Sequence, residues 1–253
     1  MRIAVLQRNI IWGDPAANRH QITETLARCE KADLYILPEM FSTGFCVRPQ
    51  EMAESMDSPT LSWLKETAMR LDGALMGSLL IQENNCFYNR LCFVKPDGEV
   101  TTYDKRHLFT FAGEDKAFTA GTRRVIVTYK GMRILLQICY DLRFPVFSRN
   151  NNDYDMAVYV ANWPTPRAEA WKILLRARAI ENQCYVVGVN RVGRDPFCGY
   201  SGDSAILDAY GRTIAACPAE KECEAYATLT TEELEKLRRK FPALDDRDDF
   251  SLL

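Results

Sequence analysis

Short apolar runs recur along the whole chain, and most of them are too short for a helix of a globular protein. Runs of this length that are apolar on both faces are typical of buried strands. Turn-forming residues at 96–99 and 130–131 separate neighbouring runs and predict hairpins. The expected strands are residues 3–6, 34–37, 74–82, 86–95, 100–103, 125–128, 133–138, 156–160, 184–190, 204–207 and 213–217.

Four other segments have the apolar spacing of helices that are buried on one side. They are residues 15–31, a segment that begins at the cap Ser58 and the first-turn Pro59, a segment that begins at Thr165-Pro166, and residues 230–240. Strands and helices alternate without a linker or an internal repeat. The pattern therefore predicts an α/β fold with mixed strand pairing, although it leaves the order of the layers open.

Three reactive side chains stand just past the ends of three expected strands. Cys139 follows the run 133–138, Glu39 follows the run 34–37, and Lys105 follows the strand 100–103. In layered α/β folds, functional sites collect at the carboxyl ends of strands. A thiol at a turn from a strand into a helix also lies beside free backbone N–H groups, which favour thiolate and can hold an oxyanion.

Each of these residues also has an ordinary structural interpretation. Cys139 is one of nine cysteines, and free cysteine is often simply a small buried residue. Glu39 could be a turn carboxylate, and Lys105 could belong to a solvated basic cluster. It is the combination of the three, each at a strand end, that indicates a catalytic site.

Composition narrows the function classes. The 253 residues are 47% hydrophobic, which predicts one domain over residues 1–253. A net charge of −2 gives no reason to expect nucleic acid or an anionic membrane as a partner. The chain has only two histidines and lacks a C-x-x-C pair, which argues against a metal site. It also lacks a nucleotide-binding fingerprint, so no cofactor is expected. The N-terminal apolar run is too short for a signal peptide and no stretch could span a bilayer, so we expect a cytoplasmic protein.

Several segments together resemble the nitrilase (carbon–nitrogen hydrolase) superfamily, and most of all its omega-amidase branch. They run from residue 37 to residue 182, and a further match extends to residue 204. The matching segments are Leu37-Pro38-Glu39-Met40-Phe41, Tyr103-Asp104-Lys105-Arg106-His107-Leu108-Phe109, Cys139-Tyr140-Asp141-Leu142-Arg143-Phe144-Pro145, Ala161-Asn162-Trp163-Pro164, Arg176-Ala177-Arg178-Ala179-Ile180-Glu181-Asn182 and Tyr200-Ser201-Gly202-Asp203-Ser204.

This resemblance implies a four-layer α-β-β-α sandwich that pairs with a second copy through its helical layers as a homodimer. It implies that Glu39, Lys105 and Cys139 form a catalytic triad and that Glu114 is the second glutamate often found beside it. It also implies a substrate class, the terminal amide of 2-oxoglutaramate or 2-oxosuccinamate. A simple loop carboxylate is an equally good interpretation of Glu114.

The chemistry of amide cleavage gives each residue a role. Glu39 takes the proton of the Cys139 thiol, Lys105 and the backbone N–H of Tyr140 hold the oxyanion, and a thioester is hydrolysed by water that Glu39 activates. Trp163 is a candidate for the pocket wall.

A substrate carboxylate would suit a guanidinium group, for which Arg167 is our choice and Arg143 the rival. Each has an ordinary interpretation: Arg167 as an exposed first-turn residue, and Arg143 as the partner of a nearby carboxylate.

Other interpretations of the same residues remain. One is a different hydrolase of the superfamily, acting on a carbamoyl compound or a nitrile. Another is a non-catalytic binding scaffold, which is disfavoured because such a scaffold could lose any of the three residues freely. A Cys–His site would need His107 near the thiol with an acid behind it; an imidazole bonded to nearby backbone is favoured instead. The other eight cysteines, Cys198 among them, are expected to be structural or incidental.

Overall fold

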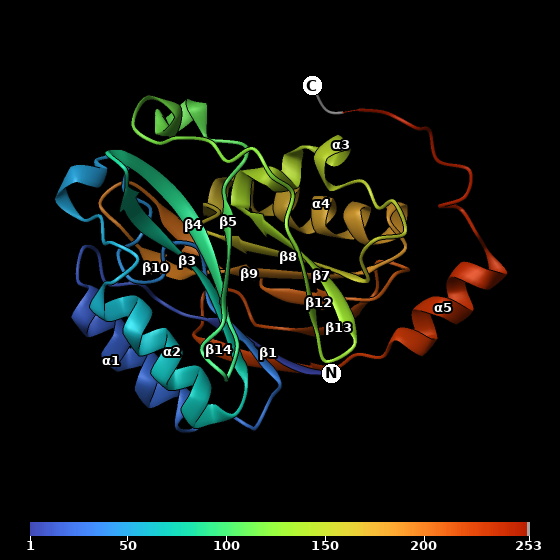
Figure 1. Ribbon diagram of the computed structural model, residues 1–253, viewed down its shortest axis with the longest axis horizontal. Coiled ribbons are helices and arrows are strands. Elements are labelled where there is room, and N and C mark those ends of the chain that lie inside the picture. The colour runs from blue at the N-terminus through green and yellow to red at the C-terminus, as the bar shows by residue number, and fades with distance from the viewer. Residues whose placement is uncertain (252–253) are drawn as a thin grey trace.

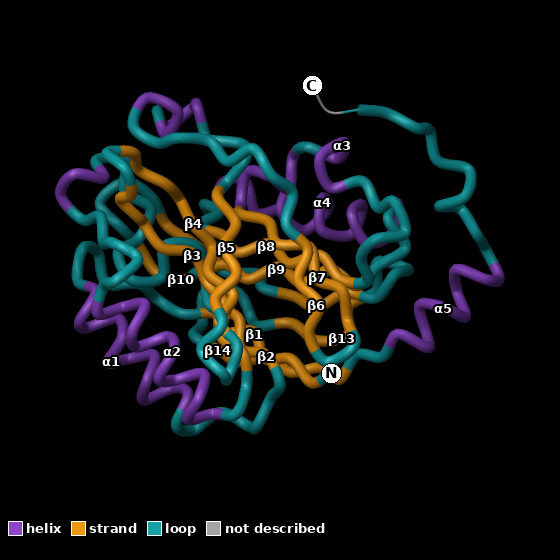
Figure 2. Tube along the Cα trace, in the orientation of Figure 1, coloured by secondary structure: helices purple, strands orange, loops and turns teal. Residues whose placement is uncertain are grey.

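The computed structural model describes residues 1–251, and two six-stranded sheets form its centre (Figure 1). Helices cover the outer faces of both sheets, as the colouring by secondary structure in Figure 2 makes plain. The α/β architecture that the sequence pattern predicted and the four-layer α-β-β-α sandwich that the resemblance implied are therefore confirmed.

The first sheet has the strand order β14-β1-β2-β3-β4-β5. Its centre is parallel from β1 to β3, whereas β4 and β5 follow as antiparallel hairpins and β14 pairs antiparallel with β1. Helices α1 and α2 cover the outer face, where Leu61, Leu64 and Ala68 of α2 are buried. The elements are β1 (Arg2–Gln7), α1 (Pro15–Leu26), β2 (Leu34–Ile36), α2 (Pro59–Leu71), β3 (Ala74–Glu83), β4 (Cys86–Val94), β5 (Val100–Asp104) and β14 (Cys223–Thr228).

The second sheet has the order β13-β12-β9-β8-β7-β6, with a parallel centre from β7 to β9. Trp171 and Leu175 of α4 pack on its outer face. A small separate hairpin, β10–β11, follows β9, and α5 follows β14. The elements are β6 (Ile126–Tyr129), β7 (Met132–Ile138), α3 (Pro145–Ser148), β8 (Met156–Ala161), α4 (Ala168–Glu181), β9 (Tyr185–Asn190), β10 (Val192–Arg194), β11 (Gly199–Ser201), β12 (Ala205–Leu207), β13 (Thr213–Ala216) and α5 (Thr231–Lys240).

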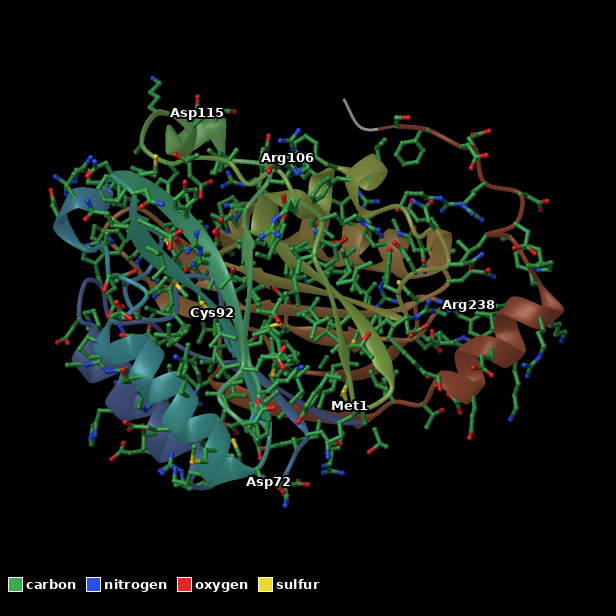
Figure 3. All side chains as sticks on the ribbon, in the orientation of Figure 1. Met1, Asp72, Cys92, Arg106, Asp115 and Arg238 are labelled. Atoms are coloured by element: carbon green, nitrogen blue, oxygen red, sulfur yellow. The ribbon has the colours of Figure 1, made fainter. Side chains whose placement is uncertain are left out.

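The main core lies between the two sheets, and Figure 3 shows the side chains that fill the layers. Successive residues of a strand point to opposite faces. In β7, Ile134, Leu136 and Ile138 therefore enter the core between the sheets, whereas Leu135 packs under the α4 layer. A strand with apolar partners on both sides is mostly apolar, which explains the run of Ile134, Leu135, Leu136 and Ile138 that the sequence presents before Cys139.

The expected strands agree with the structure to within one residue at each end, but three strands and two helix ends were not predicted. Helix α4 begins at Ala168 and not at Thr165, because residues Thr165–Arg167 form a separate 3₁₀ turn before it. Strands β10, β11 and β14 are short or lack large apolar residues; β14 buries only Ala225 and Ala227. Helix α1 ends at Leu26 and not at residue 31, because Cys29 lies in the turn that follows and its N–H bonds to the carbonyl of Thr25. Within residues 1–251, no helix has both the length and the apolar composition needed to cross a membrane.

Candidate active site

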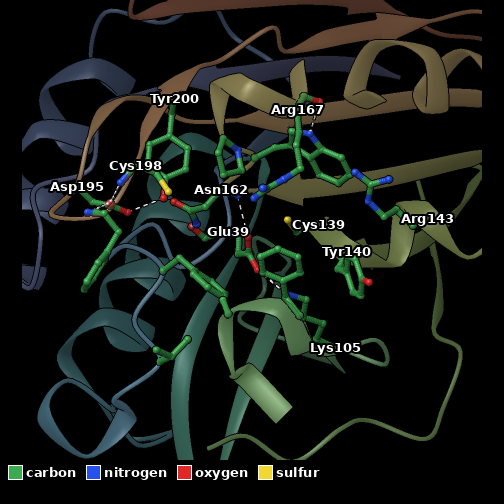
Figure 4. A pocket seen from close by; sticks show the side chains of 17 residues that line it. Glu39, Lys105, Cys139, Tyr140, Arg143, Asn162, Arg167, Asp195, Cys198 and Tyr200 are labelled. Atoms are coloured by element: carbon green, nitrogen blue, oxygen red, sulfur yellow. Dashed lines mark hydrogen bonds and ion pairs between the residues drawn. The ribbon is translucent and has the colours of Figure 1, made fainter. Parts of the chain in front are cut away.

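Glu39, Lys105 and Cys139 meet in one cavity of about 320 Å³, although they come from two different sheets (Figure 4). Glu39 follows β2 and Lys105 follows β5 in the first sheet, and Cys139 follows β7 in the second. The cavity thus lies where the ends of the two sheets face each other. The structure brings the three predicted residues together, and their catalytic roles remain a proposal.

The Cys139 turn is held in an unusual backbone conformation. Cys139 has a φ of 44°, in the left-handed region, and opens a short helical turn, Cys139–Arg143. Such a conformation costs on the order of 1–3 kcal/mol and needs support from the surroundings. The buried carboxylate of Asp141 gives that support, since it accepts hydrogen bonds from the backbone N–H of Ile138 (2.9 Å) and the hydroxyl of Tyr103 (2.7 Å).

His107 is part of this support and does not line the cavity. Its Nδ1 lies 2.7 Å from Oδ1 of Asp141, its backbone N–H donates to the same oxygen, and its ring stacks on Phe144 with 3.8 Å between centroids. The predicted backbone partner for His107 was therefore wrong, because the imidazole pairs with a buried carboxylate. That Asp–His pair braces the Cys139 turn.

Lys105 lies between two buried carboxylates. Its Nζ is 2.9 Å from Oε1 of Glu39 and 2.9 and 3.1 Å from the two oxygens of Glu114, and all three side chains are fully buried. Oε2 of Glu114 also accepts from the backbone N–H of Phe109 at 2.6 Å. Glu114 is therefore a partner of Lys105 and not a simple loop carboxylate.

Burial and charge act in opposite directions on this cluster. Burial alone would lower the pKa of Lys105, but Glu114 and Glu39 outweigh it and raise that pKa, so the amine stays a cation. Burial raises the pKa of Glu114, and Lys105 opposes the shift in part. Burial and then the Glu39 carboxylate raise the pKa of the Cys139 thiol well above its usual range, so this side chain is protonated at rest despite the N–H groups nearby.

Two asparagines orient Glu39, and sequence reasoning assigned a role to neither. Asn89 of β4 donates to Oε1 of Glu39 at 2.7 Å, and the backbone N–H of Asn162 donates to Oε2 at 2.8 Å. Met40, just after Glu39, is left-handed with a φ of 43° and donates its N–H to the hydroxyl of Ser78. The polar residue in the middle of β4, a strand that is mostly apolar on both sides of Asn89-Arg90, is the signal that could have pointed to Asn89.

Six of the 17 residues that line the cavity are aromatic, and the three predicted substrate-binding residues all line it: Tyr140, Trp163 and Arg167. Arg143 lines it as well and lies over the Trp163 ring at 4.9 Å, whereas Arg167 lies over Phe109 at 5.3 Å. Within residues 1–251, neither guanidinium has a carboxylate at ion-pair distance. The alternative in which Arg143 pairs with a nearby carboxylate is therefore wrong.

The turn between β10 and β11 closes the far side of the cavity, and the sequence did not predict this. Asp195, Phe197, Cys198 and Tyr200 all line it. Asp195 accepts from the backbone N–H groups of Phe197 and Cys198 and from the hydroxyl of Tyr200, which fixes the shape of the turn. Cys198, which was expected to be structural or incidental, thus forms part of the cavity wall. Among the residues that the structure describes, no three His, Cys, Asp or Glu side chains are grouped as metal ligands would be.

Comparison with known proteins agrees with this geometry. The family described as carbon-nitrogen hydrolase matches residues 2–239. The omega-amidase YafV of Yersinia enterocolitica is 44% identical over 254 aligned positions, and the alignment covers 100% of this chain and 99% of that protein. The 2-oxoglutaramate amidase of Bacillus subtilis is 33% identical over 250 residues, 96% of each chain.

A solved structure is also similar over its whole length. It is a CN-hydrolase superfamily protein of Xanthomonas campestris whose crystal structure has an arsenic adduct in the active site. Its TM-score is 0.97 at 44% identity, with 100% of this chain and 98% of that chain covered. The chain therefore belongs to the carbon–nitrogen hydrolase family of enzymes, as its motifs predicted.

Proposed function

We propose that this enzyme is a thiol-dependent amidase that hydrolyses the terminal amide of a small 2-oxo acid, such as 2-oxoglutaramate or 2-oxosuccinamate, to the carboxylate and ammonia. The observation that carries the proposal is the buried ion-paired cluster of Glu39, Lys105 and Glu114, of which Glu39 and Lys105 line the same cavity as Cys139. The names of the omega-amidase and 2-oxoglutaramate amidase relatives support the choice of substrate.

In the first step, the Cys139 sulfur attacks the amide carbon while Glu39 takes the thiol proton. Because the thiol is protonated at rest, proton transfer to this base accompanies the attack. Negative charge then develops on the amide oxygen. The three N–H donors of the Lys105 ammonium face Oε1 of Glu39 and both oxygens of Glu114, and the oxyanion would replace Oε1 of Glu114, the most distant of the three acceptors at 3.1 Å. The N–H of Tyr140, at the start of the helical turn, is the second donor.

In the second step, Glu39 returns the proton to the amide nitrogen, the C–N bond breaks and ammonia leaves, which gives a thioester on Cys139. Glu39 then takes a proton from water, the resulting hydroxide attacks the thioester carbon, and the thiol is released with a proton from Glu39. Asn89 and Asn162 hold the two carboxylate oxygens of Glu39 in place through both halves of the reaction.

The far end of the substrate would be bound by guanidinium groups. A 2-oxo acid amide has a carboxylate away from the scissile bond, and Arg167 and Arg143 line the cavity without a carboxylate partner in the described chain. Stacking on Phe109 and Trp163 restricts both groups, so less side-chain entropy is lost when they bind an anion. We assign the carboxylate to Arg167, with Arg143 as its rival.

A panel that measures ammonia release tests the proposal. It contains 2-oxoglutaramate, hexanamide, an N-carbamoyl amino acid and a nitrile, assayed with the unchanged enzyme and with Cys139→Ala. We expect fastest turnover of 2-oxoglutaramate and none by the variant. Preference for the carbamoyl compound or the nitrile would favour another hydrolase of the superfamily, and no turnover of any compound would favour a binding scaffold.

We also propose that two copies associate through their helical layers. Exposed apolar side chains on the outer helices support this. Ile173 and Ile180 of α4 are 62% and 55% exposed, and Met69 of α2 is 65% exposed. Light scattering after size-exclusion chromatography would report the mass, and a monomer of 28.9 kDa at micromolar concentration would contradict the proposal.

A further inference from the structure

The buried carboxylate of Asp141, two residues after Cys139, has four polar partners. Its Oδ2 accepts from the hydroxyl of Tyr103 at 2.7 Å and from the backbone N–H of Ile138 at 2.9 Å. Its Oδ1 accepts from the backbone N–H of His107 at 3.0 Å, and Nδ1 of the same residue lies 2.7 Å away. Each carboxylate oxygen therefore has two partners, and none of them is a substrate group, because Asp141 does not line the cavity.

These partners belong to both sheets. Ile138 ends β7 of the second sheet, directly before Cys139, whereas Tyr103 lies in β5 of the first sheet and His107 follows that strand. Lys105 stands midway between Tyr103 and His107 in the sequence. Asp141 thus joins the segment that presents the proposed nucleophile to the segment that presents the cation, and Figure 4 shows Lys105 and Cys139 at the cavity.

The backbone contacts of Lys105 itself do not reach the second sheet. Its N–H donates to the carbonyl of Asn89 in β4, and its carbonyl accepts from the N–H of Gly121, each at 2.9 Å. These bonds fix Lys105 relative to its own sheet. The apolar core between the sheets attracts without direction, so it sets their separation less exactly than hydrogen bonds do. The bonds to Asp141 are directional and cross from one sheet to the other.

We propose that Asp141 is a positioning residue that, through Tyr103 and His107, holds Lys105 at the distance from Cys139 at which its ammonium meets the oxyanion. The inference rests on the proposed function and adds a residue that acts on the reaction without contact to the substrate. A misplacement of about 1 Å in a catalytic group can cost roughly 100-fold in rate. Since the oxyanion exists only after attack, weaker positioning should lower kcat and leave KM nearly unchanged.

Tyr103→Phe tests this, because it removes the hydroxyl that donates to Asp141 and accepts from the N–H of Arg106 but keeps the ring in the core. A side-chain change at His107 would leave its backbone bond to Asp141 in place. With whichever compound of the panel gives turnover, Tyr103→Phe should lower kcat by roughly 10-fold and change KM by less than about two-fold.

Alkylation of Cys139 by iodoacetamide, followed by mass spectrometry of its peptide, gives a second measurement. This reaction forms a C–S bond and releases iodide without an oxyanion, so its rate should change by less than about two-fold in Tyr103→Phe. Tyr185→Phe is the matched control. Tyr185 is buried in the same core and donates its hydroxyl to the carbonyl of Thr230 at 3.0 Å, so this variant should lose similar stability and keep its kcat.

The double variant Lys105→Met/Tyr103→Phe separates positioning from a purely structural role. Once the ammonium is gone its position no longer matters, so the double variant should have the same kcat as Lys105→Met. Losses that multiply in the double variant would overturn the inference, and so would an equal effect on kcat of Tyr103→Phe and Tyr185→Phe.

Circular dichroism checks that each variant is folded. If the double variant is not, the comparison of kcat with the alkylation rate decides alone, and a parallel fall of both in Tyr103→Phe would overturn the inference. Turnover of none of the panel compounds by the unchanged enzyme is a different result: it would overturn the proposed function and the inference with it.

Discussion

Replacing Lys105 by methionine removes the cation that lies between the carboxylates of Glu39 and Glu114. Methionine fills most of the space of the aliphatic stem, so the change is chiefly one of charge. Nζ of Lys105 bonds to both carboxylates at 2.9 Å, and all three side chains are fully buried. We therefore expect Lys105→Met to reduce both catalysis and stability.

The loss of activity follows from the oxyanion. Removing one preorganised donor to a developing oxyanion typically costs about 3–4 kcal/mol, or roughly 100- to 1,000-fold in kcat. Because Lys105 carries a full charge in a buried site, the loss in kcat for Lys105→Met should lie at the upper end of this range. Ammonia release at saturating substrate measures this effect.

The loss of stability follows from the two carboxylates that remain, which approach the same NH₂ group of Asn89. Breaking a buried ion pair by removing one partner costs about 3–5 kcal/mol. For a chain of this size, that corresponds to a decrease in Tm of roughly 6–20 °C. Thermal unfolding followed by circular dichroism measures it.

The pH dependence gives a sharper test. Burial already raises the pKa of Glu114, and without Lys105 that pKa should rise further. Above the pKa of about 4.3 for glutamate in the unfolded chain, the folded variant then binds more protons than the unfolded one, so its stability falls as pH rises toward the folded pKa. The Tm difference from the unchanged enzyme should be larger at pH 8 than at pH 5.

The double variant Lys105→Met/Glu114→Gln is the control. It removes one of the two repelling charges, so it should regain much of the lost stability at pH 8 while kcat stays low. A Lys105→Met enzyme that keeps a tenth or more of its kcat would refute the oxyanion role. A Tm difference that is equal at pH 5 and pH 8 would refute the electrostatic reasoning.

Further substitutions separate the remaining roles. Cys139→Ser should abolish turnover without lowering the Tm by more than a few degrees, and residual turnover would exclude Cys139 as nucleophile. Glu39→Gln, which removes base and acid together, should lower kcat by at least about 100-fold, and a smaller loss would point to another base. His107→Asn should cost far less in kcat than either, and activity should survive EDTA; loss on chelation that a divalent ion restores would reveal a metal site. Arg167→Met should raise KM for 2-oxoglutaramate and leave hexanamide little changed, whereas the same pattern for Arg143→Met alone would assign the carboxylate to Arg143.

Most of the strands and the three candidate catalytic residues could be predicted from the local sequence. A strand that is buried on both faces is mostly apolar, so β7 and β8 stand out as apolar runs although β7 also contains Arg133 and Gln137, and the polar residues that follow such runs stand out with them. This is why Cys139, Glu39 and Lys105 were identified as candidates. Strand β14 was missed because its place in the sheet depends on pairing with β1, from which it is separated by most of the chain.

What only the tertiary structure decided is how distant segments meet. Glu39 and Lys105 belong to one sheet and Cys139 to the other, and no local pattern shows that the ends of these strands share a cavity. The pairing of His107 and Tyr103 with Asp141 likewise depends on contacts between segments. The physical reason is that side-chain periodicity records which face of an element is buried, whereas hydrogen bonds and ion pairs in a buried site depend on distances of a few ångströms that packing alone sets.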